Sequence, residues 1–104
     1  MDERSGKVLL SGFDNDEVEK AIMDNMLKNY EHKILERTSY DYLKLRLRKS
    51  RKAKTFLYQI EGELKVKSKQ FSAKAQDYNL FSVLSDVLEK LLNELTHTLR
   101  TARQ

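Results

Sequence analysis

The sequence predicts an α+β fold with the element order βαβββα, in which a four-stranded, mostly antiparallel sheet carries two helices packed on one face. Two observations support this prediction. Apolar residues recur at helical spacing within 18–34 and again within 80–99, whereas the segment between them alternates apolar and polar residues as strands do. With 104 residues, the chain is expected to form one domain spanning 1–104.

The first third of the chain predicts a short strand at residues 7–13, followed by a helix. The oxygen-bearing side chains of residues 14–16 can accept hydrogen bonds from the free N–H groups of a first helical turn. A helix between two strands also permits these strands to lie parallel. Apolar residues then recur every four positions, and we expect them to form the buried face of a helix that ends near residue 36: Val18, Ile22, Met26, Tyr30 and Ile34.

The middle of the chain predicts three consecutive strands joined by turns at 49–54 and near 67–69. Side chains of one parity share a face, so a meander of this kind has one buried and one solvent-exposed face. Three apolar lines are expected on the buried face: Leu43, Leu45 and Leu47; Phe56, Tyr58, Ile60, Gly62, Leu64 and Val66; and Phe71, Ala73 and Ala75.

The last quarter of the chain predicts an amphipathic helix of five or more turns, capped by Asp77 or Asn79. Phe81 and Leu92 fall beside its main stripe, which indicates a wide buried face in preference to a small dimer contact. The main apolar stripe consists of Leu80, Val83, Leu84, Val87, Leu88, Leu91, Leu95 and Leu99.

Composition and motifs argue against several classes of protein. The absence of cysteine excludes a disulfide framework and a thiolate metal site. His32 and His97 are isolated, the three glycines are scattered, and no phosphate loop or catalytic motif is present. We therefore expect no enzyme, no metal, no cofactor and no small-molecule substrate. The N-terminus lacks the apolar core of a signal peptide and no run is long enough to span a bilayer, so a cytoplasmic protein without membrane contact is expected.

Charge is distributed unevenly along the chain, although the net charge is only +4. Residues 14–37 hold seven acids and four cations, whereas residues 44–74 hold eleven cations and two acids. Residues 44–54 alone carry seven cations and no acid. The positive charge therefore lies in the middle of the sequence.

This basic segment favours nucleic-acid binding, because clustered Lys and Arg release condensed counterions from a phosphate backbone. Tyr42 shares a strand face with the first cations and could stack on a base or ribose. The residues expected to contact phosphates are Lys44, Arg46, Arg48, Lys49, Arg51, Lys52 and Lys54, with Lys65, Lys67, Lys69 and Lys74 as a second group.

Three alternatives remain open for the same residues. Cations also protect exposed edge strands from pairing with other chains. A basic hairpin could instead dock an acidic partner, which would make the chain a small protein–protein adaptor. A module like the double-stranded-RNA-binding domain is a more distant alternative, because the last helix lacks a lysine cluster at its start and the first strand has no counterpart there.

The segment FSAKAQDYNLFSVLSDVLEKLLNELTHTL, residues 71–99, resembles the ribosome hibernation promoting factor and ribosome-associated inhibitor family. In that family, alternating alanines in the last strand precede an acidic or amide residue, an apolar–aromatic pair and a leucine-rich helix. The opening VLLSGFDNDEVEKAIMDNMLKNYEHKI is similar to the family's first strand and helix, so the resemblance covers nearly the whole chain. The matching residues are Ala73, Ala75, Asn79, Leu80, Phe81, Leu84, Leu88, Leu91 and Leu95.

The resemblance implies a short-form member that binds rRNA in the mRNA and tRNA channel of the small ribosomal subunit. Such a protein silences idle ribosomes under stress and represses translation without chemistry. It would be monomeric off the ribosome, and would either block single ribosomes or rely on another factor to pair them. The family tends to spread cations over its helices, whereas the first helix here is net acidic. This departure moves the expected contact to the basic hairpin.

Overall fold

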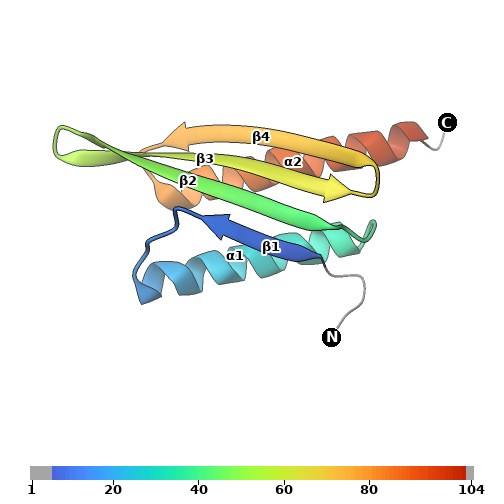
Figure 1. The fold of residues 1–104 in the computed structure, drawn as a ribbon, viewed down its shortest axis with the longest axis horizontal. Coiled ribbons are helices and arrows are strands. Elements are labelled where there is room, and N and C mark those ends of the chain that lie inside the picture. Colours follow the sequence, from blue (N-terminus) through green and yellow to red (C-terminus); the bar gives the residue numbers. More distant parts are fainter. Residues whose placement is uncertain (1–5, 103–104) are drawn as a thin grey trace.

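The computed structural model describes residues 6–102, and its architecture confirms the predicted α+β fold (Figure 1). The first five residues of the N-terminal stretch inspected for a signal peptide, and residues 103–104, lie outside the described part. The elements follow the predicted order: β1 (Lys7–Ser11), α1 (Glu17–Leu35), β2 (Tyr42–Lys52), β3 (Thr55–Val66), β4 (Lys69–Asp77) and α2 (Leu80–Ala102).

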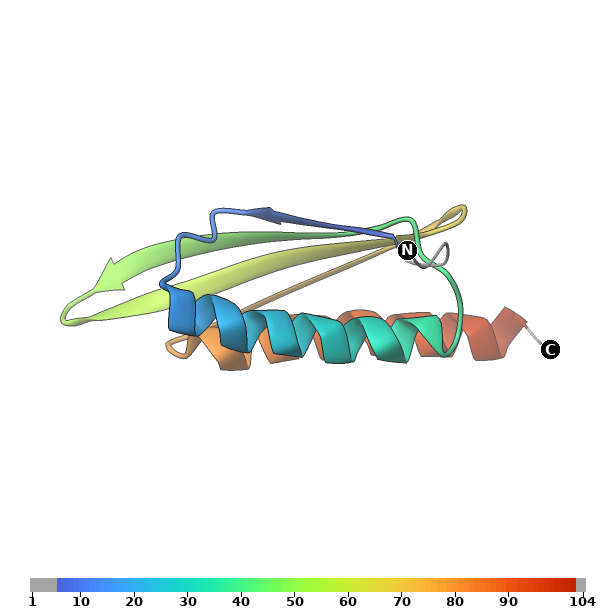
Figure 2. The same cartoon turned by 90° about the horizontal axis from the view of Figure 1, so that it is seen from below.

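The sheet has the strand order β1-β2-β3-β4, and within residues 6–102 no helix covers its second face. β1 pairs with β2 in parallel, while β2–β3 and β3–β4 are antiparallel hairpins. Both helices lie under the same face of the sheet, as Figure 2 shows from the side. The prediction of two helices on one face is thus confirmed, and the first two strands are parallel, as the intervening helix permits.

The core lies between this sheet and the two helices. Leu45, Ile60 and Leu64 point from the central strands toward the helices and are fully buried. They meet the α2 stripe, of which Val83, Leu84, Val87, Leu91 and Leu95 are almost completely buried. The alternation of the strands and the stripe of α2 were therefore predicted correctly, because both follow from local periodicity.

The buried face of α1 differs from the predicted one. Tyr30 and Ile34 are buried as expected, but Val18 is 71% exposed and Ile22 is 41% exposed. Met23 and Leu27 take their places in the core. A helix has 3.6 residues per turn, so a pattern with a strict spacing of four rotates by about 40° at each step and leaves the core-facing side.

Both helix starts use side-chain caps. Asp16 accepts from the Glu19 N–H at 2.8 Å, and the Glu19 carboxylate accepts from the Asp16 N–H at 3.4 Å, which completes a capping box. At α2, Asn79 Oδ1 accepts from the Ser82 N–H at 3.0 Å, so Asn79 and not Asp77 is the cap. Phe81 and Leu92 are partly buried against the core, which confirms the wide buried face of α2.

β1 ends two residues earlier than predicted, at Ser11. Gly12 has a φ of +79°, and a Cβ on it would lie 2.2 Å from the Leu47 carbonyl oxygen. The chain therefore turns away from β2 at a position that only glycine tolerates.

The hairpin between β2 and β3 also differs from the prediction. Residues 49–54 were expected to form a turn, but β2 continues to Lys52 and only Ala53 and Lys54 form the turn. Ala53 adopts a φ of 55°, the positive sign that two-residue hairpin loops require at their first position. The paired part of the hairpin is consequently longer than predicted.

Tyr30 carries a buried hydroxyl group with no hydrogen-bond partner among residues 6–102. Burial raises the pKa of this phenol. A buried polar group without a partner costs about 1–3 kcal/mol. We therefore expect Tyr30→Phe to raise the free energy of unfolding, measured by urea denaturation, by about 1 kcal/mol.

Tyr40→Phe is the matched variant. Its hydroxyl donates a hydrogen bond to the Glu31 carboxylate, so its loss is expected to lower the free energy of unfolding by a similar amount. A loss of stability in Tyr30→Phe would contradict this account of the hydroxyl.

Candidate nucleic-acid interface

The end of the β2–β3 hairpin projects from the body of the protein. β1 pairs with β2 only as far as Arg46, and β4 pairs with β3 only from Tyr58 onward. Beyond these positions β2 and β3 form a two-stranded ribbon, which projects past the N-terminal ends of both helices (Figures 1 and 2). We call residues 48–57 the basic arm.

The basic arm concentrates positive charge on both of its faces. By the alternation of the strand, Arg48 and Lys52 lie on the open face of the sheet, whereas Lys49 and Arg51 lie on the face that carries the helices. All are exposed, because no helix covers the ribbon there. Their partners across the hairpin are uncharged: Arg48 faces Gln59, Lys49 faces Tyr58, Arg51 faces Phe56 and Lys52 faces Thr55. With Lys54 in the turn, five cations lie on the arm without an acid opposite any of them.

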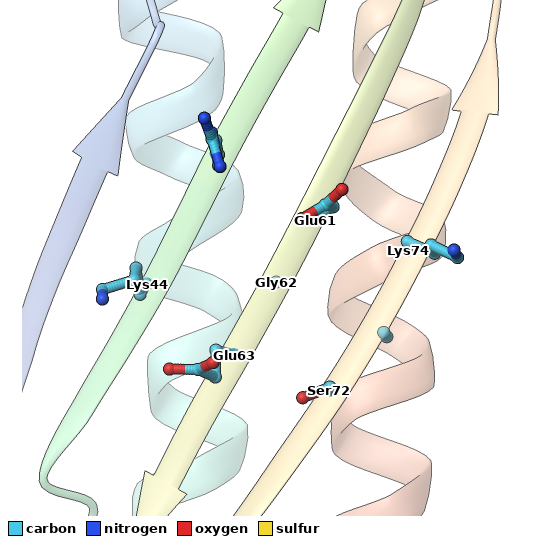
Figure 3. A pocket seen from close by; sticks show the side chains of 8 residues that line it. Lys44, Glu61, Gly62, Glu63, Ser72 and Lys74 are labelled. Carbon is cyan, nitrogen blue, oxygen red and sulfur yellow. The ribbon is translucent and has the colours of Figure 1, made fainter.

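The cations of the central sheet lie in a different electrostatic setting. Lys44 is directly opposite Glu63, and Arg46 is opposite Glu61. Lys74 on β4 faces Glu61 from the other side. Figure 3 shows Lys44, Glu61, Glu63 and Lys74 on one face of three neighbouring strands, around a shallow depression that is open to solvent. Opposite charges at such positions stabilise the sheet by about 0.2–1 kcal/mol per pair and reduce the field available to a phosphate.

Tyr42 belongs to this balanced region and not to the arm. Its hydroxyl donates a hydrogen bond to Glu63 Oε2 at 3.1 Å. That bond to a carboxylate raises the pKa of Tyr42. The hydroxyl is thereby tied to the open sheet face, next to Lys44 and Glu63, well away from the uncompensated cations.

Lys65, Lys67 and Lys69 lie at the opposite end of the sheet from the arm. The length of β3 separates the two turns by about 35 Å at about 3.3 Å per residue (Figure 1). Asp41 is next to this turn, where its carboxylate accepts from the Lys67 N–H at 3.1 Å. The twelve predicted residues therefore divide into three groups, and the arm gathers the largest of them, five cations with no carboxylate directly opposite.

Phe56 was expected in the buried line of β3, and this prediction was wrong. The residue is 40% exposed on the helix side of the arm, and Lys49 Nζ lies 5.0 Å from the centroid of its ring. Alternation indicates the face on which a side chain lies, but not whether a helix covers that part of the face. The signal that could have singled out Phe56 is its position two residues after segment 44–54, which carries seven cations and no acid.

The two histidines lie on different helices. His32 and His97 are both exposed. Within residues 6–102, no group of three or more His, Cys, Asp or Glu side chains is arranged to hold a metal ion. Over the same range, no helix combines the length and the apolar character needed to cross a membrane.

Comparison with known proteins relates the chain to others by fold. No family model and no curated protein sequence matches it. Among solved structures, a ribosomal subunit interface protein from Coxiella burnetii superposes with a TM-score of 0.64. The alignment covers 88% of this chain and 96% of that protein, at 10% sequence identity. At this identity the match establishes a shared fold.

Proposed function

We propose that the protein binds the small ribosomal subunit through contacts with rRNA and represses translation by occupying the mRNA and tRNA channel. The observation that carries this proposal is the basic arm, a projecting ribbon with five cations and no acid opposite them. The shared fold with a ribosomal subunit interface protein supports the ribosome as the partner. The function needs neither a catalytic group nor a cofactor, and it places the protein in the cytoplasm, as a monomer when it is off the ribosome.

The shape and charge of the molecule suit this role. The principal extents are 50 × 30 × 18 Å, so the molecule is a thin plate that the arm lengthens. Acids outnumber cations in the segment that contains α1, and phosphates would repel that side. RNA would therefore be met by the arm first, followed by the open sheet face. Steric occupation of the channel would then exclude mRNA and tRNA, as the resemblance to hibernation factors implies.

Sedimentation of the protein with ribosomes through sucrose gradients tests the proposal. If each of the five arm cations contacts one phosphate of unpaired RNA, log K should fall against log salt with a slope of about −3.5. The affinity for small subunits should then decrease by about 100-fold between 50 and 200 mM salt. We expect comigration with small subunits at low salt and loss at high salt.

The other outcomes separate the proposal from its rivals. Protein that remains at the top of the gradient at low salt would refute it. If an acidic protein were the partner, the chain would still sediment with that protein after the ribosomal RNA is digested. A double-stranded-RNA-binding-like module would bind an isolated RNA duplex as tightly as the subunit. Either of these results would replace the proposed function with the corresponding alternative.

A further inference from the structure

The helix-side face of the arm presents an aromatic ring that the fold itself does not use. Ile60 and Leu64 occupy the same line of β3 and are fully buried, whereas Phe56 is 40% exposed. β4 pairs with β3 only from Tyr58, which lies opposite Asp77, so Phe56 has no neighbour on the β4 side. The core therefore ends before Phe56, and burial within the protein does not account for a large apolar side chain at this position.

Two cations flank this ring on the same face. Lys49 Nζ lies 5.0 Å from the ring centroid, a distance at which a cation–π interaction holds the ring and the ammonium group together. Arg51 is directly opposite Phe56 on β2, where facing Cβ atoms are about 5 Å apart. Lys49 and Arg51 are two residues apart on one strand, about 7 Å, so their charged groups can reach to either side of the ring.

We propose that Phe56 is a stacking platform for an unpaired nucleobase, with Lys49 and Arg51 contacting the phosphates on either side of that base. The inference rests on the RNA binding proposed above and specifies the kind of RNA that the arm takes. A base within a duplex is already stacked on both faces, and the major groove of A-form RNA is too deep and narrow for side chains to read. The ligand is therefore single-stranded or looped RNA with at least one splayed base.

The absence of tryptophan from the sequence allows a direct test. Phe56→Trp places a single fluorescent indole at the proposed platform and retains an aromatic face. Leu57→Trp is the matched control, because the next residue of β3 points to the opposite face of the same ribbon. Titration with a 12-nucleotide oligouridine should quench the fluorescence of Phe56→Trp strongly and that of Leu57→Trp weakly. Equal quenching in the two variants would overturn the proposal.

Affinity measurements provide the second readout. Phe56→Leu keeps an apolar side chain of similar size but removes the ring. Because stacking of a base on an aromatic side chain contributes about 5- to 150-fold in affinity, we expect Phe56→Leu to weaken oligouridine binding at least about fivefold. The slope of log K against log salt should be unchanged, since no phosphate contact is lost. Binding to a 12-base-pair RNA duplex should also be unchanged, and circular dichroism should confirm that the variant is folded.

Failure of this inference can be distinguished from failure of the proposed function. If Phe56→Leu binds oligouridine like the wild type while charge reversal of the arm abolishes ribosome binding, stacking is refuted and the proposed function stands. If Phe56→Leu weakens duplex binding to the same extent, the ring supports the shape of the arm and stacking is again refuted. If the wild type binds neither oligouridine nor small subunits, both proposals fall.

Discussion

Replacing Arg48, Arg51 and Lys52 by glutamate is expected to weaken binding to small ribosomal subunits by roughly 100-fold or more. A solvent-exposed ionic contact contributes up to about 1 kcal/mol, and three lost contacts therefore correspond to about two orders of magnitude in affinity. Repulsion between the new carboxylates and phosphates adds to this loss. The slope of log K against log salt should fall from about −3.5 to about −1.4. Equilibrium binding to purified subunits at several salt concentrations measures both quantities.

The matched control makes the same change in charge at the other end of the sheet. Lys65, Lys67 and Lys69 lie at the opposite end of β3, with Lys65 about 20 Å from Arg48, the nearest arm cation, so their replacement by glutamate alters the net charge equally but leaves the arm intact. We expect this control to lose less than about tenfold in affinity, through long-range electrostatics alone. Equal losses in the two variants would show that net charge matters and that the arm has no special role.

Arg46 is a poor choice for such an experiment, although the sequence places it with the arm cations. It lies directly opposite Glu61, so Arg46→Glu would set two carboxylates against each other and weaken the sheet. Arg48 faces Gln59 and carries no such penalty. Reversal of the arm cations therefore separates the effect on binding from the effect on folding.

The difference between Arg46 and Arg48 shows where prediction from the sequence ended. A turn over residues 49–54 would have paired Lys44 with Gln59 and Arg46 with Leu57. The observed two-residue turn shifts the register by four residues, which pairs Lys44 with Glu63 and Arg46 with Glu61. Register depends on the exact position of the turn, and a turn without glycine, proline or asparagine gives no local signal for that position.

The faces of the elements were easier to predict than the extent of their coverage. Period two correctly assigned Leu43, Leu45 and Leu47 to the buried side, because side-chain alternation is fixed by the strand itself. Whether a helix lies beneath a given residue is decided by tertiary structure, and this is why Phe56 was expected in the core. The same limit applies to Val18, since the apolar residues of α1 do not identify the stripe that meets the sheet.

The extent to which helices cover the sheet, and the register between β2 and β3, also determine the candidate interface. The arm is electrostatically distinct because it extends beyond both its neighbouring strands and the helices, and because the acids of β3 lie farther along the hairpin. With the shorter hairpin expected from the sequence, Arg48 would end the paired region, and Lys49, Arg51 and Lys52 would lie in a loop instead of on a paired ribbon. The length of the two-stranded ribbon therefore matters to the proposed interface as well as the number of its cations.

Gly62→Val is expected to destabilise the protein by about 3 kcal/mol and to lower its melting temperature by more than about 10 °C. Gly62 is buried at the centre of β3, where α2 approaches the sheet. A Cβ added there would lie 2.6 Å from Val87 Cγ1 and 3.1 Å from both Leu45 Cδ2 and Leu91 Cδ1. These neighbours are themselves fully buried, so they cannot move aside without disturbing the core. Thermal and urea denaturation measure the effect.

A double-mutant cycle identifies the contact responsible. Gly62→Ala should cost about 1–2 kcal/mol through the clash with Val87, although alanine alone would favour the strand by about 0.5–1 kcal/mol. Val87→Ala removes the clashing methyl group, so the double variant should be more stable than the sum of the single effects predicts. A stabilising Gly62→Ala would contradict the close approach of α2. Because Gly62 is remote from the arm, folded Gly62→Ala should bind small subunits like the wild type at low temperature, which separates the stability of the plate from the proposed binding role of its arm.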